Sequence, residues 1–249
     1  MNDTSKKGLP SRVNENATYP GSELEIFAEA TNWKNYYSQK LHPYISGDVL
    51  EVGSGLGTNT EFLQKHWENG TWYCCEPDPE LLARSKKVEG CKYFNTRLGG
   101  FSQDLKFDTI IYIDVLEHIK HSRDEIELIT RRLRPRGNLI ILVPAQERLF
   151  NSFDTAIGHY RRYSKLRLRE DYRGLMRIKH IGYYDSLGLI AAIANKLFFK
   201  KSEPTRRAVL FWDRILVPCS KILDPLIAFR AGKSLIAVLE RPEISAYSD

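Results

Sequence analysis

Three runs in this chain combine residue types and spacings suited to chemistry. The first is a glycine-rich run at 49–58, VLEVGSGLGT. Glycines adopt positive φ and let a ligand approach the backbone closely, so such a run between a strand and a helix predicts a ligand cradle. The second is DVLEHI at 114–119, and the third is DTAIGHYRRY at 154–163. Their acids, imidazoles and guanidinium groups could move protons or hold an anion.

The glycine spacing excludes two common ligand motifs. A dinucleotide fingerprint needs G-x-G-x-x-G; Gly53 and Gly55 fit it, but Thr58 stands at the third position and the glycine falls at Gly57. A P-loop would need Gly-Lys followed by Ser or Thr, which this run lacks. Glu76 ends the next predicted strand about 20 residues later, where a carboxylate can accept hydrogen bonds from ribose hydroxyls.

Strands and helices are predicted to alternate around these runs. Helical spacing of apolar residues predicts helices at 23–42, 58–67, 79–87 and 122–133. Apolar runs predict strands at 47–52, 71–75, 92–95, 107–113, 139–143, 177–184 and 234–240. This alternation indicates an α/β fold with a doubly wound, mostly parallel, seven-stranded Rossmann-like sheet.

Four motifs resemble, in order and spacing, those of class I S-adenosylmethionine-dependent methyltransferases of the small-molecule acceptor subgroup. E-x-G-x-G-x-G at 51–57 resembles the first family motif, and E-P-D-P-E at 76–80 resembles the acidic turn after strand two. The segment 114–118 is similar to the loop after strand four. Residues 133–139 resemble the turn before strand five, with an arginine in place of the first glycine. The resemblance covers 49–144.

The resemblance implies S-adenosylmethionine as cofactor and S-adenosylhomocysteine as product. Relatives pack the glycine loop against the amino-acid and ribose parts of the cofactor. Many relatives hold the adenine amino group with an acid after strand three; this chain has none there, so we assign that contact to backbone and apolar groups. The cofactor-binding residues expected are Glu51, Gly53, Ser54, Gly55, Gly57, Glu76, Pro77, Arg97, Leu98, Asp114 and Val115.

Two histidines are the expected catalytic residues. Methyl transfer is an in-line displacement, so the enzyme must align the acceptor and free its lone pair. His118 follows strand four, and His159 lies after strand five, where the family binds its acceptor. Alternatively, His118 packs under the cofactor and Glu117 caps a helix. Arg161 and Arg162 could hold a phosphate or carboxylate, or pair with acids.

A metal site is another interpretation of the same residues. Asp114, Glu117 and His118 form D-x-x-E-H. This resembles the E-x-x-E-H that some metal-using O-methyltransferases place, with a later histidine, around a divalent cation. Such a donor set would suit an ion, but Asp114 is better explained as a cofactor contact. We therefore assign no metal from the sequence.

The chain of 249 residues, with 42% hydrophobic and 27% charged, suits a single domain at 21–249 after a polar leader at 1–20, which we expect to be disordered. We divide it into a cofactor-binding core (45–145), an acceptor-side segment (146–176) and a helical insertion before the last strand (185–232). No secretion signal and no apolar run of roughly 20 residues is visible, so a cytoplasmic location is expected.

Apolar and basic residues alternate through 187–230. This pattern suits a helical cap, a lid over an apolar acceptor, a peripheral contact with an anionic membrane, or a homodimer surface. The net charge of +6 is compatible with an acidic substrate, a nucleic acid or a membrane.

The expected function is methyl transfer to a small molecule, most readily at oxygen, with an apolar, lipid-linked or polyketide-like acceptor favoured by the insertion. Two alternatives stay open. The acceptor could be a protein or nucleic acid, although the absence of a recognisable RNA-binding module leads us to expect no nucleic-acid partner. The chain could also be a cofactor-binding, non-catalytic partner subunit.

Overall fold

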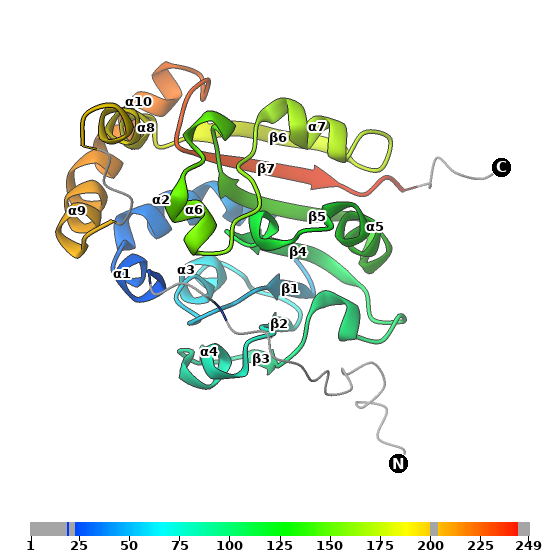
Figure 1. Ribbon diagram of the computed structural model, residues 1–249. Helices are drawn as coiled ribbons and strands as arrows, with labels where there is room; N and C mark the ends of the chain where they lie inside the picture. The colour runs from blue at the N-terminus through cyan, green and yellow to red at the C-terminus, as the bar shows by residue number, and fades with distance from the viewer. Residues whose placement is uncertain (1–18, 20–22, 200–203, 244–249) are drawn as a thin grey trace, which may run out of the picture.

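The computed structural model describes residues 19, 23–199 and 204–243 (Figure 1). Its centre is a seven-stranded sheet in the order β3-β2-β1-β4-β5-β7-β6. The first five strands pair in parallel, and β7 runs antiparallel to both β5 and β6. The predicted doubly wound, mostly parallel sheet is confirmed, and so is a helical insertion before the last strand.

The strands lie close to their predicted positions. They are β1 (Val49–Val52), β2 (Trp72–Cys75), β3 (Cys91–Phe94), β4 (Phe107–Ile113), β5 (Leu133–Pro144), β6 (Arg177–Tyr184) and β7 (Ser234–Glu240). Only β5 is much longer than predicted, because Leu133 already pairs with Phe107 across an irregularity in register.

The helices cover both faces of this sheet. They are α1 (Leu24–Ala28), α2 (Thr31–Leu41), α3 (Thr60–Gln64), α4 (Pro79–Arg84), α5 (Ser122–Arg132), α6 (Ser152–Ala156), α7 (Lys165–Asp171), α8 (Ser186–Ala194), α9 (Arg206–Phe211) and α10 (Val217–Leu226). Ile110 and Leu139 face one hydrophobic cluster, whereas Ile111 and Ile140 face the other. Burial on both faces explains why β4 and β5 are continuous apolar runs.

The single helix expected at 23–42 is wrong. The structure has two helices, which break at Ala30. The first amides of α2 are satisfied from the insertion: the amides of Asn32 and Trp33 donate to the carboxylate of Asp213, at 3.2 and 2.9 Å. This distant residue replaces a local helix cap, so the periodicity of the segment alone could not reveal the break.

The insertion consists of α8, α9 and α10, with π-helical turns at Asn195–Phe199 and Trp212–Leu216. These helices lie on the same side of the molecule as α1 and α2 (Figure 1). Among the described residues, none of the helices combines the length and hydropathy that crossing a bilayer requires. The leader predicted at 1–20 falls outside the described residues, apart from Tyr19.

Candidate active site

A cavity of about 1120 Å³ lies at the carboxyl ends of β1, β2, β4 and β5. The loops that follow these strands form one side of it, and residues of α1, α8 and α9 form the other. Ligand sites for drug-sized molecules measure roughly 300–1,000 Å³. The cavity therefore lies just above the upper end of this range.

The glycine loop forms one end of the cavity. Gly53 and Gly55 have φ values of +69° and +52°, which glycine adopts without strain. A Cβ on Gly53 would lie 2.5 Å from a methyl carbon of Val115, whereas a Cβ on Gly55 would meet open space. The amides of Gly53 and Ser54 donate to the carbonyl of Cys75, at 2.8 and 3.1 Å, and hold the loop on β2.

Glu76 presents a fixed carboxylate beside this loop. Its Oε2 accepts from the amide of Gly55 at 2.9 Å, and its Oε1 accepts from the amide of Asp78 at 3.0 Å. Burial raises the pKa of Glu76, and these two hydrogen bonds oppose the rise. Each carboxylate oxygen can accept a further hydrogen bond, so the group can still receive ligand hydroxyls.

Most of the expected cofactor residues line this cavity, but Glu51 and Gly57 do not. The carboxylate of Glu51 lies in the core, where it accepts from the indole nitrogen of Trp72 at 3.2 Å. A Cβ on Gly57 would meet the carbonyl oxygen of Lys86 at 2.4 Å. Both residues are therefore packed within the protein and do not face the cavity. The expected residues that do line the cavity are Gly53, Ser54, Gly55, Glu76, Pro77, Arg97, Leu98, Asp114 and Val115.

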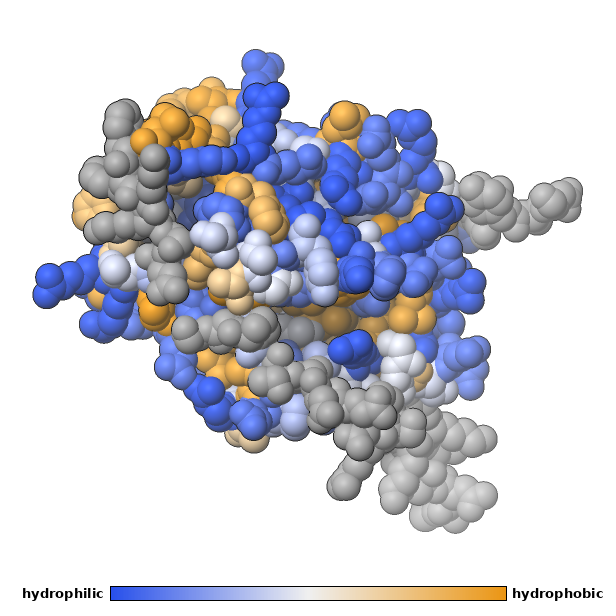
Figure 2. All heavy atoms as spheres, viewed as in Figure 1, coloured by the Kyte–Doolittle hydropathy of each residue, from blue (hydrophilic) through white to orange (hydrophobic). Residues whose placement is uncertain are grey.

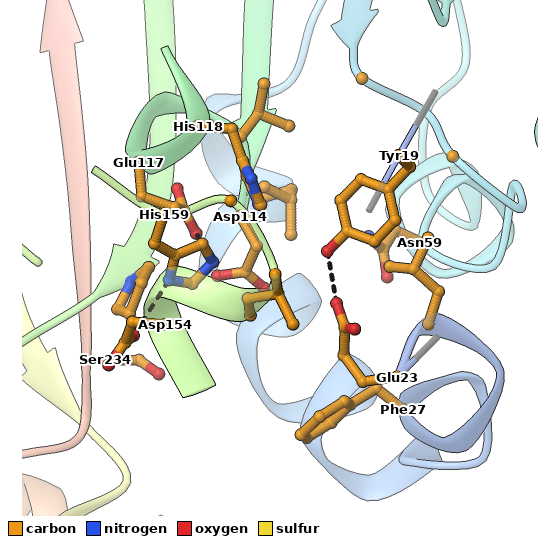
Figure 3. Close-up of a pocket in the computed structure, with 18 of the residues that line it drawn as sticks. Tyr19, Glu23, Phe27, Asn59, Asp114, Glu117, His118, Asp154, His159 and Ser234 are labelled. Atoms are coloured by element: carbon orange, nitrogen blue, oxygen red, sulfur yellow. Dashed lines mark hydrogen bonds and ion pairs between the residues drawn. The ribbon is translucent and has the colours of Figure 1, made fainter. Parts of the chain in front are cut away.

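The other end of the cavity holds five side chains that we call the acid–histidine cluster: Asp114, Glu117, His118, Asp154 and His159. The rings of His118 and His159 meet edge to face, with centroids 4.5 Å apart (Figure 3). His159 Nε2 lies 3.8 Å from Glu117 Oε1. The cluster brings together both histidines that the sequence analysis expected to be catalytic.

Asp154 holds His159 in place. Its Oδ1 lies 3.0 Å from His159 Nδ1, and its two oxygens accept from Arg162 Nε at 2.9 and 3.1 Å. Asn151 and Asp154 form a capping box that fixes the start of α6. Arg162 is therefore engaged by a buried acid, while Arg161 donates to the carbonyl of Lys120 at 2.7 Å.

Burial sets the charges in the cluster. Both oxygens of Glu117 are buried without a hydrogen-bond partner among the described residues, and desolvation, together with Asp114 and Asp154, raises the pKa of Glu117 well above its usual range. Desolvation also lowers the pKa of His118 to about 4, so this ring is neutral and weakly basic at pH 7. The side chain of Asp114 is open to the cavity, yet enclosure by protein raises its pKa to about 6.

Tyr19 and Lys233 are among the cavity residues that no sequence pattern predicted. Tyr19 lies in the polar leader, where no pattern marks it; its amide donates to Asp78 Oδ2 at 2.7 Å and its ring packs against His118. Lys233 directly precedes β7, and its Nζ lies 4.5 Å from the centroid of the Trp212 ring. Burial lowers the pKa of Lys233. Lone residues of this kind carry no motif that spacing could detect.

A family model described as a methyltransferase domain matches residues 24–195, more than half of the chain. The chain belongs to this family. It is a class I S-adenosylmethionine-dependent methyltransferase, as the motifs at 51–57, 76–80 and 114–118 indicated. A search of the curated proteins found no match to this methyltransferase.

Solved structures share the fold. A chain from the complex between the Haloferax volcanii Trm112 methyltransferase activator and a methyltransferase has a TM-score of 0.59 at 16% identity, over 88% of this chain and 92% of that one. The N-methyltransferase NodS from Bradyrhizobium japonicum, in complex with S-adenosyl-l-homocysteine, has a TM-score of 0.54 at 14% identity, over 86% and 89%. Phosphoethanolamine N-methyltransferase 2 of Haemonchus contortus has a TM-score of 0.57 at 15% identity, over 89% of this chain and 58% of that one.

The residues at the glycine-loop end fit the cofactor of the family. Gly55 leaves open space above the loop, and Glu76 has acceptor capacity for ribose hydroxyls. Leu98 and Val115 add apolar surface to the same end. The acid–histidine cluster lines the same cavity.

Proposed function

We propose that this methyltransferase transfers a methyl group to a hydroxyl oxygen of an apolar, lipid-linked or polyketide-like small molecule. The observation that carries this proposal is that one cavity is lined by two different groups of residues. One group is the glycine loop together with Glu76, and the other is the acid–histidine cluster. When bound, S-adenosylmethionine supplies a methyl group on a positively charged sulfur.

At the cofactor end, we assign the amino-acid part of the cofactor to the loop at 53–55 and the ribose to Glu76. We assign Arg97 and Leu98 to the adenine, because both line the cavity. Asp114 and Val115, directly after β4, are the remaining cavity residues that we assign to the cofactor. Of the two expected cofactor residues outside the cavity, Glu51 supports β2 and Gly57 allows close packing beside Lys86.

At the acceptor end, we assign catalysis to His118 and His159. A hydroxyl is a poor nucleophile until its proton is removed or its oxygen is polarised. Asp154 fixes the ring of His159 so that Nε2 points to the centre of the cluster. An acceptor oxygen that enters between the two rings would be oriented and polarised there.

The insertion supports an apolar acceptor. Its inner face lines the cavity with small and apolar side chains, among them Gly188, Ala191, Ala192, Ala208, Val209 and Trp212. These side chains offer no charged partner to a polar acceptor. An aliphatic or aromatic chain could pack along them and present its hydroxyl to the cluster.

The outer face of the insertion supports a peripheral membrane contact. Large apolar side chains are exposed on it, at Ile190, Ile193, Leu197, Phe211, Ile215, Ile222 and Leu226. Figure 2 shows hydrophobic residues gathered where α8 and α10 lie. Among its described residues, the aspartates are buried, whereas Lys196, Arg207 and Arg214 are exposed. An apolar face with basic neighbours suits an anionic membrane interface.

The test uses methyl-labelled S-adenosylmethionine with an extract of the source cell, and excess S-adenosylhomocysteine as the inhibited control. We expect label in the organic phase that stays there after washing with acid and with alkali, because a methyl ether is neutral. Label that moves into acid would indicate a methylated amine and contradict transfer to oxygen. Label in protein or nucleic acid would favour a macromolecular acceptor, and cofactor binding without transfer would indicate a non-catalytic subunit.

A further inference from the structure

The carboxylate of Glu117 is a buried group that the proposed function does not use, and its ion-pair contact among the described residues is with His159 Nε2, at 3.8 Å. The side chain is 0% exposed, and neither oxygen accepts a hydrogen bond from the described residues. A buried carboxylate that accepts no hydrogen bond is costly, so structures normally pair it closely or bind a cation with it. Glu117 points into the acid–histidine cluster and not into the apolar core (Figure 3).

Two imidazoles share this position. Glu117, His118 and His159 each offer one ligand atom, and the three atoms lie within 4.8 Å of one another. Ligand atoms of a zinc-type ion sit about 2.0–2.2 Å from the metal, so small side-chain rotations would bring the three atoms around one ion. Two imidazoles and one carboxylate are a donor set that Zn²⁺ and similar divalent ions accept.

The second nitrogen of His159 is already anchored, and His118 also has a backbone partner. His159 Nδ1 lies 3.0 Å from the carboxylate of Asp154, which Arg162 holds in turn. His118 is hydrogen-bonded to the backbone of Gly158. Histidines that bind metals donate their other ring N–H to a carboxylate or a carbonyl in this way, which fixes the ring and leaves the second nitrogen free for the ion.

We propose that Glu117, His118 and His159 bind a divalent transition-metal cation of the Zn²⁺ class. This departs from the sequence-based assignment of no metal, because the buried carboxylate that accepts no hydrogen bond and the partners of the two rings are visible only in three dimensions. The use of the ion rests on the proposed function: an ion with three protein ligands keeps a position for the acceptor oxygen and would polarise it.

The experiment is calorimetric titration of ZnCl₂ into the full chain after treatment with a chelator, without cofactor. We expect one ion per chain and a higher melting temperature with the ion. Glu117→Gln keeps the shape of the side chain but removes its charge, and should weaken the affinity by about 100-fold or more. Asp154→Asn should weaken it by about 10-fold or more, because His159 loses its anchor.

His66→Ala is the matched control. His42 and His66 form another pair of rings with centroids 4.5 Å apart, outside the cavity. The proposal requires that His66→Ala leave the affinity unchanged. An absence of binding heat, equal affinities of wild type and a folded Glu117→Gln variant, or loss of binding in His66→Ala would each overturn it.

Different results would contradict the proposed metal site and the proposed methyl transfer. Transfer to a hydroxyl that continues after complete chelation would overturn the use of the ion in the reaction and leave the proposed function intact. A tightly bound ion in a chain that methylates no hydroxyl would overturn the proposed function and leave the metal site intact.

Discussion

Gly53 and Gly55 share a positive φ but differ in what surrounds them. Gly53→Ala places a methyl group 2.5 Å from Val115 Cγ2, whereas Gly55→Ala meets open space. We expect Gly53→Ala to lower the free energy of unfolding by about 2–4 kcal/mol, from strain plus overpacking, and Gly55→Ala by about 1–2 kcal/mol, from strain alone. Urea denaturation measures both. Val115→Ala should partly rescue Gly53→Ala; equal losses in the two alanine variants would contradict the packing described.

Glu76 is expected to carry much of the cofactor affinity. Glu76→Ala removes the carboxylate that we assign to the ribose and releases the amides of Gly55 and Asp78. We expect the affinity for S-adenosylmethionine, measured by calorimetry, to fall by about 10-fold or more. Glu80→Ala removes an exposed carboxylate nearby and serves as the control. Unchanged affinity in Glu76→Ala would rule out the ribose contact.

Glu51 makes stability depend on pH. Desolvation raises the pKa of Glu51 from 4.5 to about 7. The folded state then binds this proton more tightly than the unfolded chain does. The contribution of Glu51 to the free energy of unfolding is therefore complete below pH 4.5 and is lost as pH rises through about 7. The loss is about 3 kcal/mol by linkage.

Glu51→Gln removes this titration. Between pH 5 and pH 8, we expect the free energy of unfolding, measured by urea denaturation, to fall in both proteins. The fall should be about 3 kcal/mol smaller in Glu51→Gln than in wild type. Glu61→Gln, at an exposed position on α3, should follow wild type. Parallel pH profiles for wild type and Glu51→Gln would show that the carboxylate is not desolvated.

Local motifs explain which site residues the sequence could predict. The glycine loop and Glu76 were found because a turn after a strand has a characteristic spacing. Glu51 belongs to the same motif, yet its side chain points into the core, and spacing along a strand does not report which partners a side chain meets. Tyr19 and Lys233 reach the cavity from segments without a motif.

The elements followed the sequence wherever the apolar pattern of the segment itself marks them. Strand β4 occupies its predicted bounds because its apolar residues are buried on both faces. The break between α1 and α2 depends on Asp213, which lies far along the chain. Interactions between distant elements are therefore the part of the fold that hydrophobic periodicity could not predict.

The outer face of the insertion gives a prediction for this element. Ile222 and Leu226 on α10 are 71% and 78% exposed, so Ile222→Glu with Leu226→Glu should leave the fold intact. We expect the double variant to lose most of its sedimentation with anionic phospholipid vesicles, because burial of apolar side chains drives such binding. Leu166→Glu, at a 64% exposed residue of α7, is the control. Unchanged vesicle binding, or a shift from dimer to monomer, would favour a homodimer surface.

On the scale of the whole molecule, topology gathers distant residues into one cavity. Parallel strands end at the same edge, so Gly53, Glu76 and Asp114 meet although they lie far apart in sequence. That convergence was predictable from the alternation of strands and helices. The sequence offered a lid only as one of several alternatives for 187–230, because the packing of α1 and the insertion over the cavity depends on tertiary contacts.

The most direct test compares wild type with His159→Ala in two measurements on one preparation, the affinity for S-adenosylmethionine and the rate of methyl transfer to the organic-soluble product. If the two ends of the cavity have separate roles, the affinity stays within about twofold while transfer falls by about 100-fold or more. Transfer at the wild-type rate in His159→Ala would contradict the assignment of the acid–histidine cluster to the acceptor.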